Sequence, residues 1–195
     1  MSKVKDKGKK IRQEVKNEFI LNVPNTLTLL RLVFMFIIGY LIWIDFSYIT
    51  IAIIFAIAAA TDWLDGFFAR KLNQKSDLGA RLDQVIDRVF MIPIILLLLW
   101  KLYSFDKSVA YLLIACLSRE IIATPGFIIR IIRDKDAYKV KYIGKVTTFI
   151  QSVAIVLIVL GREIALLENI AWYVAIATGL IGIVAGLDYL RDSID

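Results

Sequence analysis

The chain has 195 residues, of which 59% are hydrophobic, with a mean hydropathy of +0.71 and a formal net charge of +6. Soluble domains contain about 45–50% apolar residues, so this composition excludes an ordinary soluble domain and predicts an all-α integral membrane protein. With no histidine and a single cysteine, Cys116, any acid–base or metal chemistry falls to carboxylates.

The N-terminal arm, residues 1–20, is basic, with seven Lys or Arg among the first sixteen residues. It lacks the apolar core and cleavage site of a secretory signal peptide. We expect either a solvated tail or an arm resting on anionic membrane lipids; the net charge requires no nucleic-acid partner. Pro24 then indicates a helix start, and an amphipathic interfacial helix is expected ahead of it.

Six apolar segments separated by short polar loops are the expected transmembrane helices, and they occupy nearly the whole chain as a single domain over residues 1–195. They cover residues 27–44, 49–69, 78–102, 109–132, 143–160 and 170–187. Lys and Arg are concentrated in the arm and in the loops after the second and fourth segments. The positive-inside rule therefore places both termini on the cytoplasmic side of the cytoplasmic membrane.

Two pairs of aspartates lie toward the cytoplasmic ends of the second and third expected helices. Asp62 and Asp65 are three residues apart, and Asp83 and Asp87 are four apart, so each pair shares one helix face. Intramembrane carboxylates cost about 2.5–3.5 kcal/mol each, and clustered like charges repel. Two divalent cations, Mg²⁺ or Mn²⁺, would balance the four charges and accept a diphosphate substrate. The alternative is that the aspartates face water or pair with nearby arginines, namely Arg70, Arg81 and Arg88.

The aspartates belong to a longer pattern, D-x2-D-G-x2-A-R-x8-G-x3-D-x3-D. Its fixed positions are Asp62, Asp65, Gly66, Ala69, Arg70, Gly79, Asp83 and Asp87. In this pattern the chain resembles the CDP-alcohol phosphotransferase family, and the segments NVPNTLTLLR, SREII and GKVTTFIQ are similar to its phosphatidylglycerophosphate synthase branch. The segment DQVIDR departs from that branch, whose members more often carry Pro after the third aspartate and end in Ala-Asp-Lys.

The resemblance implies a homodimeric, six-helix transferase of phospholipid biosynthesis that moves a phosphatidyl group from CDP-diacylglycerol to an alcohol and releases CMP. It implies that the four aspartates hold the two divalent cations and that Asp87 is also the catalytic base. The residues it implies for binding the donor nucleotide and diphosphate are Asn25, Asp65, Gly66, Ala69, Arg70 and Gly79.

A second basic set lies on the fourth and fifth expected helices and the loop between them. It comprises Arg119, Arg130, Arg133, Lys141 and Lys145. Guanidinium groups bind phosphate through paired hydrogen bonds, so we expect a phosphorylated acceptor, with glycerol 3-phosphate as the first choice. For Arg133 and Lys141 the alternative is an ordinary positive-inside loop.

Other assignments stay open on the sequence alone. Phosphatidylglycerol, giving cardiolipin, or inositol phosphate could replace glycerol 3-phosphate as the acceptor. Intramembrane prenyltransferases also place aspartates around metal and diphosphate, but they resemble longer chains with differently spaced acidic motifs. A cation transporter would line a path with acidic residues. Here the acidic residues gather on one side of the expected membrane, which disfavours conduction.

Overall fold

The computed structural model is a bundle of helices, and it describes residues 23–71, 77–103, 106–132 and 142–194. The helices of this part are α2 (Val23–Trp43), α3 (Tyr48–Lys71), α4 (Asp77–Tyr103), α5 (Lys107–Ile132), α6 (Tyr142–Leu160) and α7 (Ala165–Ile194). Each contains most of one expected transmembrane segment, and the described residues form no strand. The basic arm and the segment ahead of Pro24, where the interfacial helix is expected, lie outside the described residues.

Three of these helices are long and apolar enough to cross a membrane. Their apolar stretches are Thr26–Trp43 in α2, Lys107–Gly126 in α5 and Ala165–Asp188 in α7. The apolar stretches of α3 and α6 are shorter, and the first turns of α4 contain five charged residues. The expected all-helical membrane architecture is thus found, with three helices in the described part, rather than six, meeting both criteria for a membrane span.

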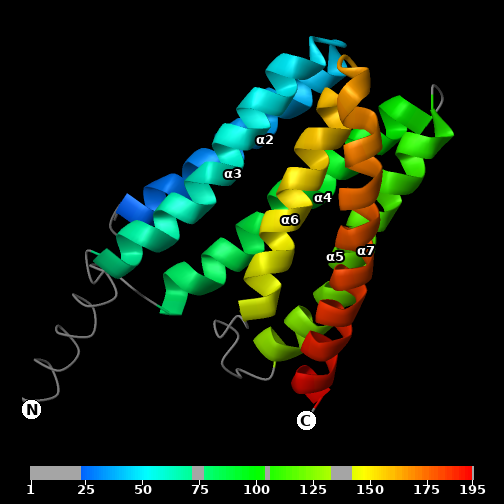
Figure 1. Cartoon of the computed structure of the whole chain (residues 1–195). Helices are drawn as coiled ribbons and strands as arrows, with labels where there is room; N and C mark the ends of the chain where they lie inside the picture. The colour runs from blue at the N-terminus through cyan, green and yellow to red at the C-terminus, as the bar shows by residue number, and fades with distance from the viewer. Residues whose placement is uncertain (1–22, 72–76, 104–105, 133–141, 195) are drawn as a thin grey trace, which may run out of the picture.

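The helices alternate in direction, so their ends gather at opposite ends of the bundle (Figure 1). The start of α2, the end of α3, the start of α4, the end of α5, the start of α6 and the end of α7 lie at one end, which we call the near end. The opposite end, where α2 turns into α3 and α6 into α7, is the far end. The helix ends that carry the aspartate motif therefore lie at the near end.

The turn between α2 and α3 is fixed to the end of α4 at the far end. Asp45 has a φ of 54°, a left-handed conformation that Asp tolerates better than most residues, and its Oδ2 lies 2.5 Å from Nζ of Lys101. Beside this ion pair the rings of Trp43 and Trp100 stack with their centroids 5.6 Å apart. Exposed tryptophans at helix ends are typical of a membrane–water interface.

The loop between α6 and α7 links two further parts of the far end. Nη1 of Arg162 lies 3.3 Å from Oδ2 of Asp106, which precedes α5. The backbone N–H of Tyr48 donates a hydrogen bond of 2.6 Å to Glu163, so this carboxylate stabilises the first turn of α3. Exposed ion pairs contribute little singly, about 0–1 kcal/mol. Together these contacts tie neighbouring hairpins to one another.

The interior of the bundle is apolar, and its outer surface is apolar as well. Helix α2 packs against both α3 and α4, and α3 and α4 meet through the buried rings of Phe55 and Phe90, whose centroids lie 5.4 Å apart. Outward-facing Phe36 and Tyr173 are 71% and 79% exposed. Such large exposed apolar side chains fit a lipid environment, whereas soluble monomers rarely present so much apolar surface.

Close packing of α7 on α5 depends on small residues. A Cβ added to Gly179 would lie 3.1 Å from Cβ of Ala115, and one added to Gly186 would lie 2.7 Å from Cγ2 of Ile122. Small residues let transmembrane helices approach closely, and that approach replaces the hydrophobic driving force that lipid does not provide. The α5–α7 pair therefore forms a tight unit.

Candidate active site

The aspartates of α3 and α4 occupy matching positions along their helices. Asp65 lies six residues before the end of α3 at Lys71, and Asp83 lies six residues after the start of α4 at Asp77. At 1.5 Å per residue, both backbone positions are about 9 Å from the near end of their helix. The side chains of Asp62 and Asp65 lie outside the described part of the structure, so their part in the site stays a prediction.

The two aspartates of α4 converge on one arginine of α2. Nη1 of Arg31 lies 3.3 Å from Oδ1 of Asp83, and the same nitrogen donates a short hydrogen bond to Oδ1 of Asp87. The Arg31 side chain is 2% exposed, whereas those of Asp83 and Asp87 are 34% and 29% exposed. The guanidinium thus approaches the carboxylates from the interior, and both carboxylates remain accessible from solvent.

Arg31 is the one charged residue in the expected segment 27–44, and this explains why its side chain points to the carboxylates of α4. A buried cation in an apolar environment is destabilising unless carboxylates or other acceptors surround it. Arg31 was not among the partners expected for the aspartates, namely Arg70, Arg81 and Arg88, and the side chains of Arg70 and Arg81 lie outside the described part. Nη1 of Arg88 donates a hydrogen bond of 3.0 Å to the backbone oxygen of Gln84. A lone charge in an otherwise apolar helix was the signal available in the sequence.

The contact with Arg31 tests whether these residues suit a divalent cation. Two carboxylate oxygens from adjacent turns lie within bonding distance of a single positively charged nitrogen, which here stands in for a cation. Carboxylate oxygens are the ligands that Mg²⁺ and Mn²⁺ prefer. Among the side chains that the structure describes, no three acidic, histidine or cysteine residues group together. The chemistry of Asp83 and Asp87 therefore suits a divalent cation, and their part in a metal site stays a prediction.

The residues expected to bind the donor lie in the helix turns at the near end of α2, α3 and α4. Asn25 lies in the first turn of α2, and Gly79 lies in the first turn of α4. Gly66, Ala69 and Arg70 lie in the last two turns of α3. The structure describes their helical backbone but not their side-chain surroundings, so their roles in binding the nucleotide and diphosphate stay predictions.

A buried hydrogen bond fixes α6 to α5 near the expected acceptor residues. Nε2 of Gln151 donates to the backbone oxygen of Cys116 at 3.1 Å, and both residues are fully buried. Measured from this link toward the near end, Arg119 lies three residues along α5 and Lys145 six residues along α6. These offsets correspond to about 4.5 and 9 Å, so the two backbone positions differ in depth by about one helical turn.

The other members of the expected acceptor set lie further toward the near end. Arg130 follows Arg119 by eleven residues, which places it on nearly the same face of α5 but about 16 Å further along the helix. Arg133 and Lys141 lie outside the described residues. The structure describes the backbone, and not the side chains, of Arg119, Arg130 and Lys145. Because of this distance, a phosphate at the level of Arg119 and Lys145 would occupy a different position from a phosphate beside Arg130.

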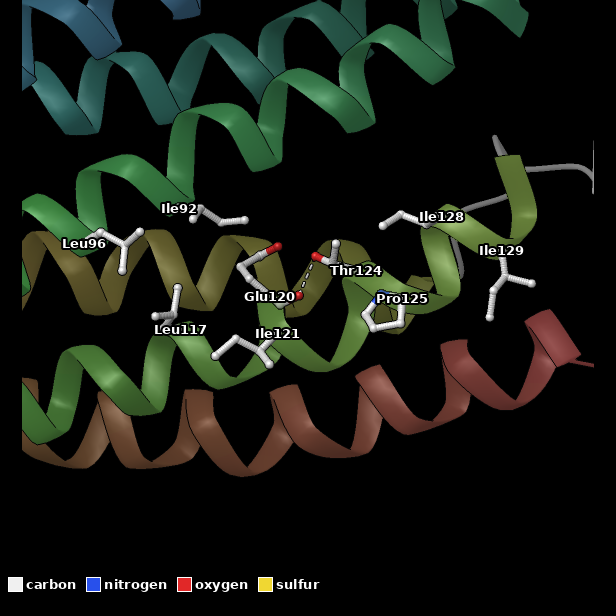
Figure 2. A pocket seen from close by; sticks show the side chains of 9 residues that line it. All are labelled: Ile92, Leu96, Leu117, Glu120, Ile121, Thr124, Pro125, Ile128 and Ile129. Carbon is white, nitrogen blue, oxygen red and sulfur yellow. Dashed lines mark hydrogen bonds between the residues drawn. The ribbon is translucent and has the colours of Figure 1, made fainter. Parts of the chain in front are cut away.

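An apolar groove of about 650 Å³ lies between parts of α4 and α5 (Figure 2). Its lining consists of Ile92, Leu96, Leu117, Glu120, Ile121, Thr124, Pro125, Ile128 and Ile129. The side chain of Glu120 enters it, and Thr124 donates a hydrogen bond of 2.6 Å to the backbone oxygen of Glu120. Such a lining suits hydrocarbon and not a charged diphosphate. The groove is a feature distinct from the Asp83 and Asp87 pair, starting five residues beyond Asp87 along α4.

Comparisons with known proteins show the family of the chain. The CDP-alcohol phosphatidyltransferase family matches residues 21–183, which include all four aspartates and the expected acceptor residues. The chain belongs to this family, and the resemblance drawn from the aspartate pattern is confirmed. Members of the family are transferases and generally depend on divalent cations. With three helices able to cross a membrane, the chain is an integral membrane enzyme.

Individual relatives carry a more specific name. The chain is 38% identical over 138 residues, covering 69% of this chain and 75% of the relative, to the CDP-diacylglycerol--glycerol-3-phosphate 3-phosphatidyltransferase of Wigglesworthia glossinidia brevipalpis. It is 33% identical over 142 residues, covering 69% and 74%, to the enzyme of the same name from Escherichia coli strain K12. Over 81 residues, 40% and 41% of the two chains, it is 44% identical to the enzyme of that name from Pseudomonas fluorescens.

Proposed function

We propose that this protein transfers the phosphatidyl group of CDP-diacylglycerol to the primary hydroxyl of glycerol 3-phosphate, giving phosphatidylglycerol phosphate and CMP. The names of its relatives support this assignment. The structural observation that carries it is the convergence of Asp83 and Asp87 on one cationic nitrogen at the solvent-accessible side of a buried arginine. Paired carboxylates of this kind are what a metal-dependent transfer from a diphosphate requires.

The residues that would hold the divalent cations are Asp62, Asp65, Asp83 and Asp87. When bound, two Mg²⁺ or Mn²⁺ ions would neutralise the donor diphosphate and stabilise the phosphate of CMP as it leaves. Gly66 and Gly79 would let the cytidine and diphosphate approach the backbone of α3 and α4. Asn25 and Arg70 would complete this donor site from the first turn of α2 and the last turn of α3.

Asp87 would act as the general base. The oxygen of the acceptor hydroxyl forms a bond to the phosphorus that carries diacylglycerol, its proton passes to a carboxylate oxygen of Asp87, and the bond from that phosphorus to the oxygen of CMP breaks. With no histidine in the chain, a carboxylate is the natural proton acceptor. The Asp87 side chain is 29% exposed, so an acceptor hydroxyl can reach it from solvent.

The acceptor phosphate would bind Arg119 and Lys145. Counted from the far ends of their own helices, Asp62, Asp87, Arg119 and Lys145 lie about 18–24 Å along α3, α4, α5 and α6. This common level would allow one small molecule to present its phosphate to the basic pair and its hydroxyl to Asp87. Arg130 would then attract the acceptor nearer the entrance, where Arg133 and Lys141 belong to the same basic region.

We further propose that all six helices cross the cytoplasmic membrane and that the near end faces the cytoplasm. The basic residues of the N-terminal arm and of the loops joined to the near end support this orientation. A water-soluble acceptor and CMP would then exchange directly with the cytoplasm. Assembly as a homodimer is expected from the family resemblance.

Release of CMP from CDP-diacylglycerol tests the proposal. Purified protein with Mg²⁺ and CDP-diacylglycerol would be given glycerol 3-phosphate, phosphatidylglycerol or inositol phosphate in parallel, with lipid products identified by mass spectrometry. We expect CMP and phosphatidylglycerol phosphate in equal amounts with glycerol 3-phosphate. Faster CMP release with another acceptor would reassign the substrate. Cation flux into liposomes, or diphosphate release from a prenyl donor, without any CMP would overturn the enzyme class.

A further inference from the structure

Arg31 occupies carboxylate oxygens that a bound cation would also use. Its Nη1 atom contacts Oδ1 of Asp83 at 3.3 Å and Oδ1 of Asp87 at hydrogen-bonding distance. Both oxygens belong to residues that the proposed function assigns to the metal site. A divalent cation bound by the same oxygens would lie a few ångströms from the guanidinium, where the two positive charges repel. The contact with Arg31 and the binding of a cation therefore compete.

Burial restricts the positions that the Arg31 side chain can adopt when its contact with the carboxylates weakens. Its side chain is 2% exposed and lies between α2 and α4, so it cannot simply turn into solvent. When the two carboxylates bind a cation instead, a further anion beside the buried guanidinium would compensate for the weakened contact. The diphosphate of the donor is such an anion, because guanidinium groups bind phosphate oxygens through paired hydrogen bonds.

We propose that Arg31 is a positioning residue that holds Asp83 and Asp87 together and that would contact the donor diphosphate in place of these carboxylates when they bind a cation. The inference rests on the proposed function, since it requires a divalent cation and a diphosphate at this site. Its consequence is ordered loading: the cation binds weakly alone and tightly with the donor. Such a link would limit the binding of metal to the enzyme when no substrate is present.

The test measures Mn²⁺ affinity in detergent by the electron paramagnetic resonance signal of free Mn²⁺, with and without CDP-diacylglycerol. We expect Arg31→Gln to raise Mn²⁺ affinity about tenfold without the donor, and the donor to improve affinity far less than in the unaltered protein. Arg31→Lys keeps the charge but not the planar guanidinium group, so its Mn²⁺ affinity should lie between those of Arg31→Gln and the unaltered protein. The matched control is Arg162→Gln, which breaks the ion pair with Asp106 at the far end and should leave Mn²⁺ affinity unchanged.

A second readout is the melting temperature in the presence of a metal chelator. Loss of Arg31 removes a positive charge from between two neighbouring carboxylates, so we expect Arg31→Gln to melt lower in chelator and to regain more stability than the unaltered protein when Mn²⁺ is added. If neither Arg31 variant changes Mn²⁺ affinity or its dependence on the donor, the inference is wrong while the proposed function stands. If the unaltered protein binds no Mn²⁺ even with the donor, both fail together.

Discussion

Asp83 and Asp87 lie one turn apart on α4 and direct their Oδ1 atoms to the same nitrogen, Nη1 of Arg31 on α2. The aspartates of α4 are therefore held by a residue of the first described helix. Because α2 packs against both α3 and α4, a shift of Arg31 would change the packing of the two helices that carry the aspartate motif. The predictions below separate the roles of these residues.

Asp87→Asn should reduce CMP release at least about 10²-fold, since an amide cannot accept the proton of the acceptor hydroxyl. Binding of CDP-diacylglycerol should be largely kept, because Asp62, Asp65 and Asp83 remain. The measurement is the rate constant of CMP formation beside the donor dissociation constant. Asp45→Asn is the matched control: it makes the same chemical change at the far end, and Asn tolerates the left-handed φ of 54° there. Full activity of Asp87→Asn would remove Asp87 as the base.

Arg119→Ala should raise the KM for glycerol 3-phosphate about tenfold or more and change the KM for CDP-diacylglycerol little. The reason is that Arg119 and Lys145 would hold the acceptor phosphate, whereas the donor binds the motif residues of α3 and α4. Arg191→Ala removes an arginine from an exposed position on α7 and serves as the control. Equal effects on both substrates would indicate that Arg119 supports the fold and not the acceptor.

Gly186→Ala should destabilise the bundle by about 1–3 kcal/mol, because the new Cβ would lie 2.7 Å from Cγ2 of Ile122 on α5. This methyl carbon is attached directly to Cβ, close to the backbone, and cannot move aside easily. Gly39→Ala on α2 is the control, since its Cβ would lie 3.8 Å from Cδ2 of Leu97, an ordinary contact. Thermal unfolding in detergent compares them, and equal melting temperatures for the two variants would contradict the close packing of α5 on α7.

The positions of the helices could be predicted from hydropathy, but their full lengths could not. The expected segment 170–187 lies within α7, which begins at Ala165 and continues to Ile194. Its last turns include Asp188 and Arg191, which end the apolar pattern without ending the helix. Hydropathy reports the part of a helix that suits lipid, whereas backbone hydrogen bonds continue a helix into water.

The composition of the site was partly predictable for a similar reason. Spacing within one helix places Asp83 and Asp87 on one face of α4, and the structure has their carboxylates converging. Spacing cannot identify which neighbouring helix that face meets, so the role of Arg31 required the tertiary structure. The groove beside Glu120 was unforeseen for the same reason, since it depends on how α4 and α5 diverge.

The central claim is that α3 and α4 contribute carboxylates to one shared cation site. A double-mutant cycle of Mn²⁺ affinity tests it most directly, with Asp65→Asn, Asp83→Asn and the two combined, each measured in the presence of CDP-diacylglycerol. If the two aspartates serve one site, each single change should weaken Mn²⁺ binding strongly, and the double change should weaken it far less than the product of the two single effects. Fold changes that simply multiply would place the two carboxylates in separate environments and contradict the claim.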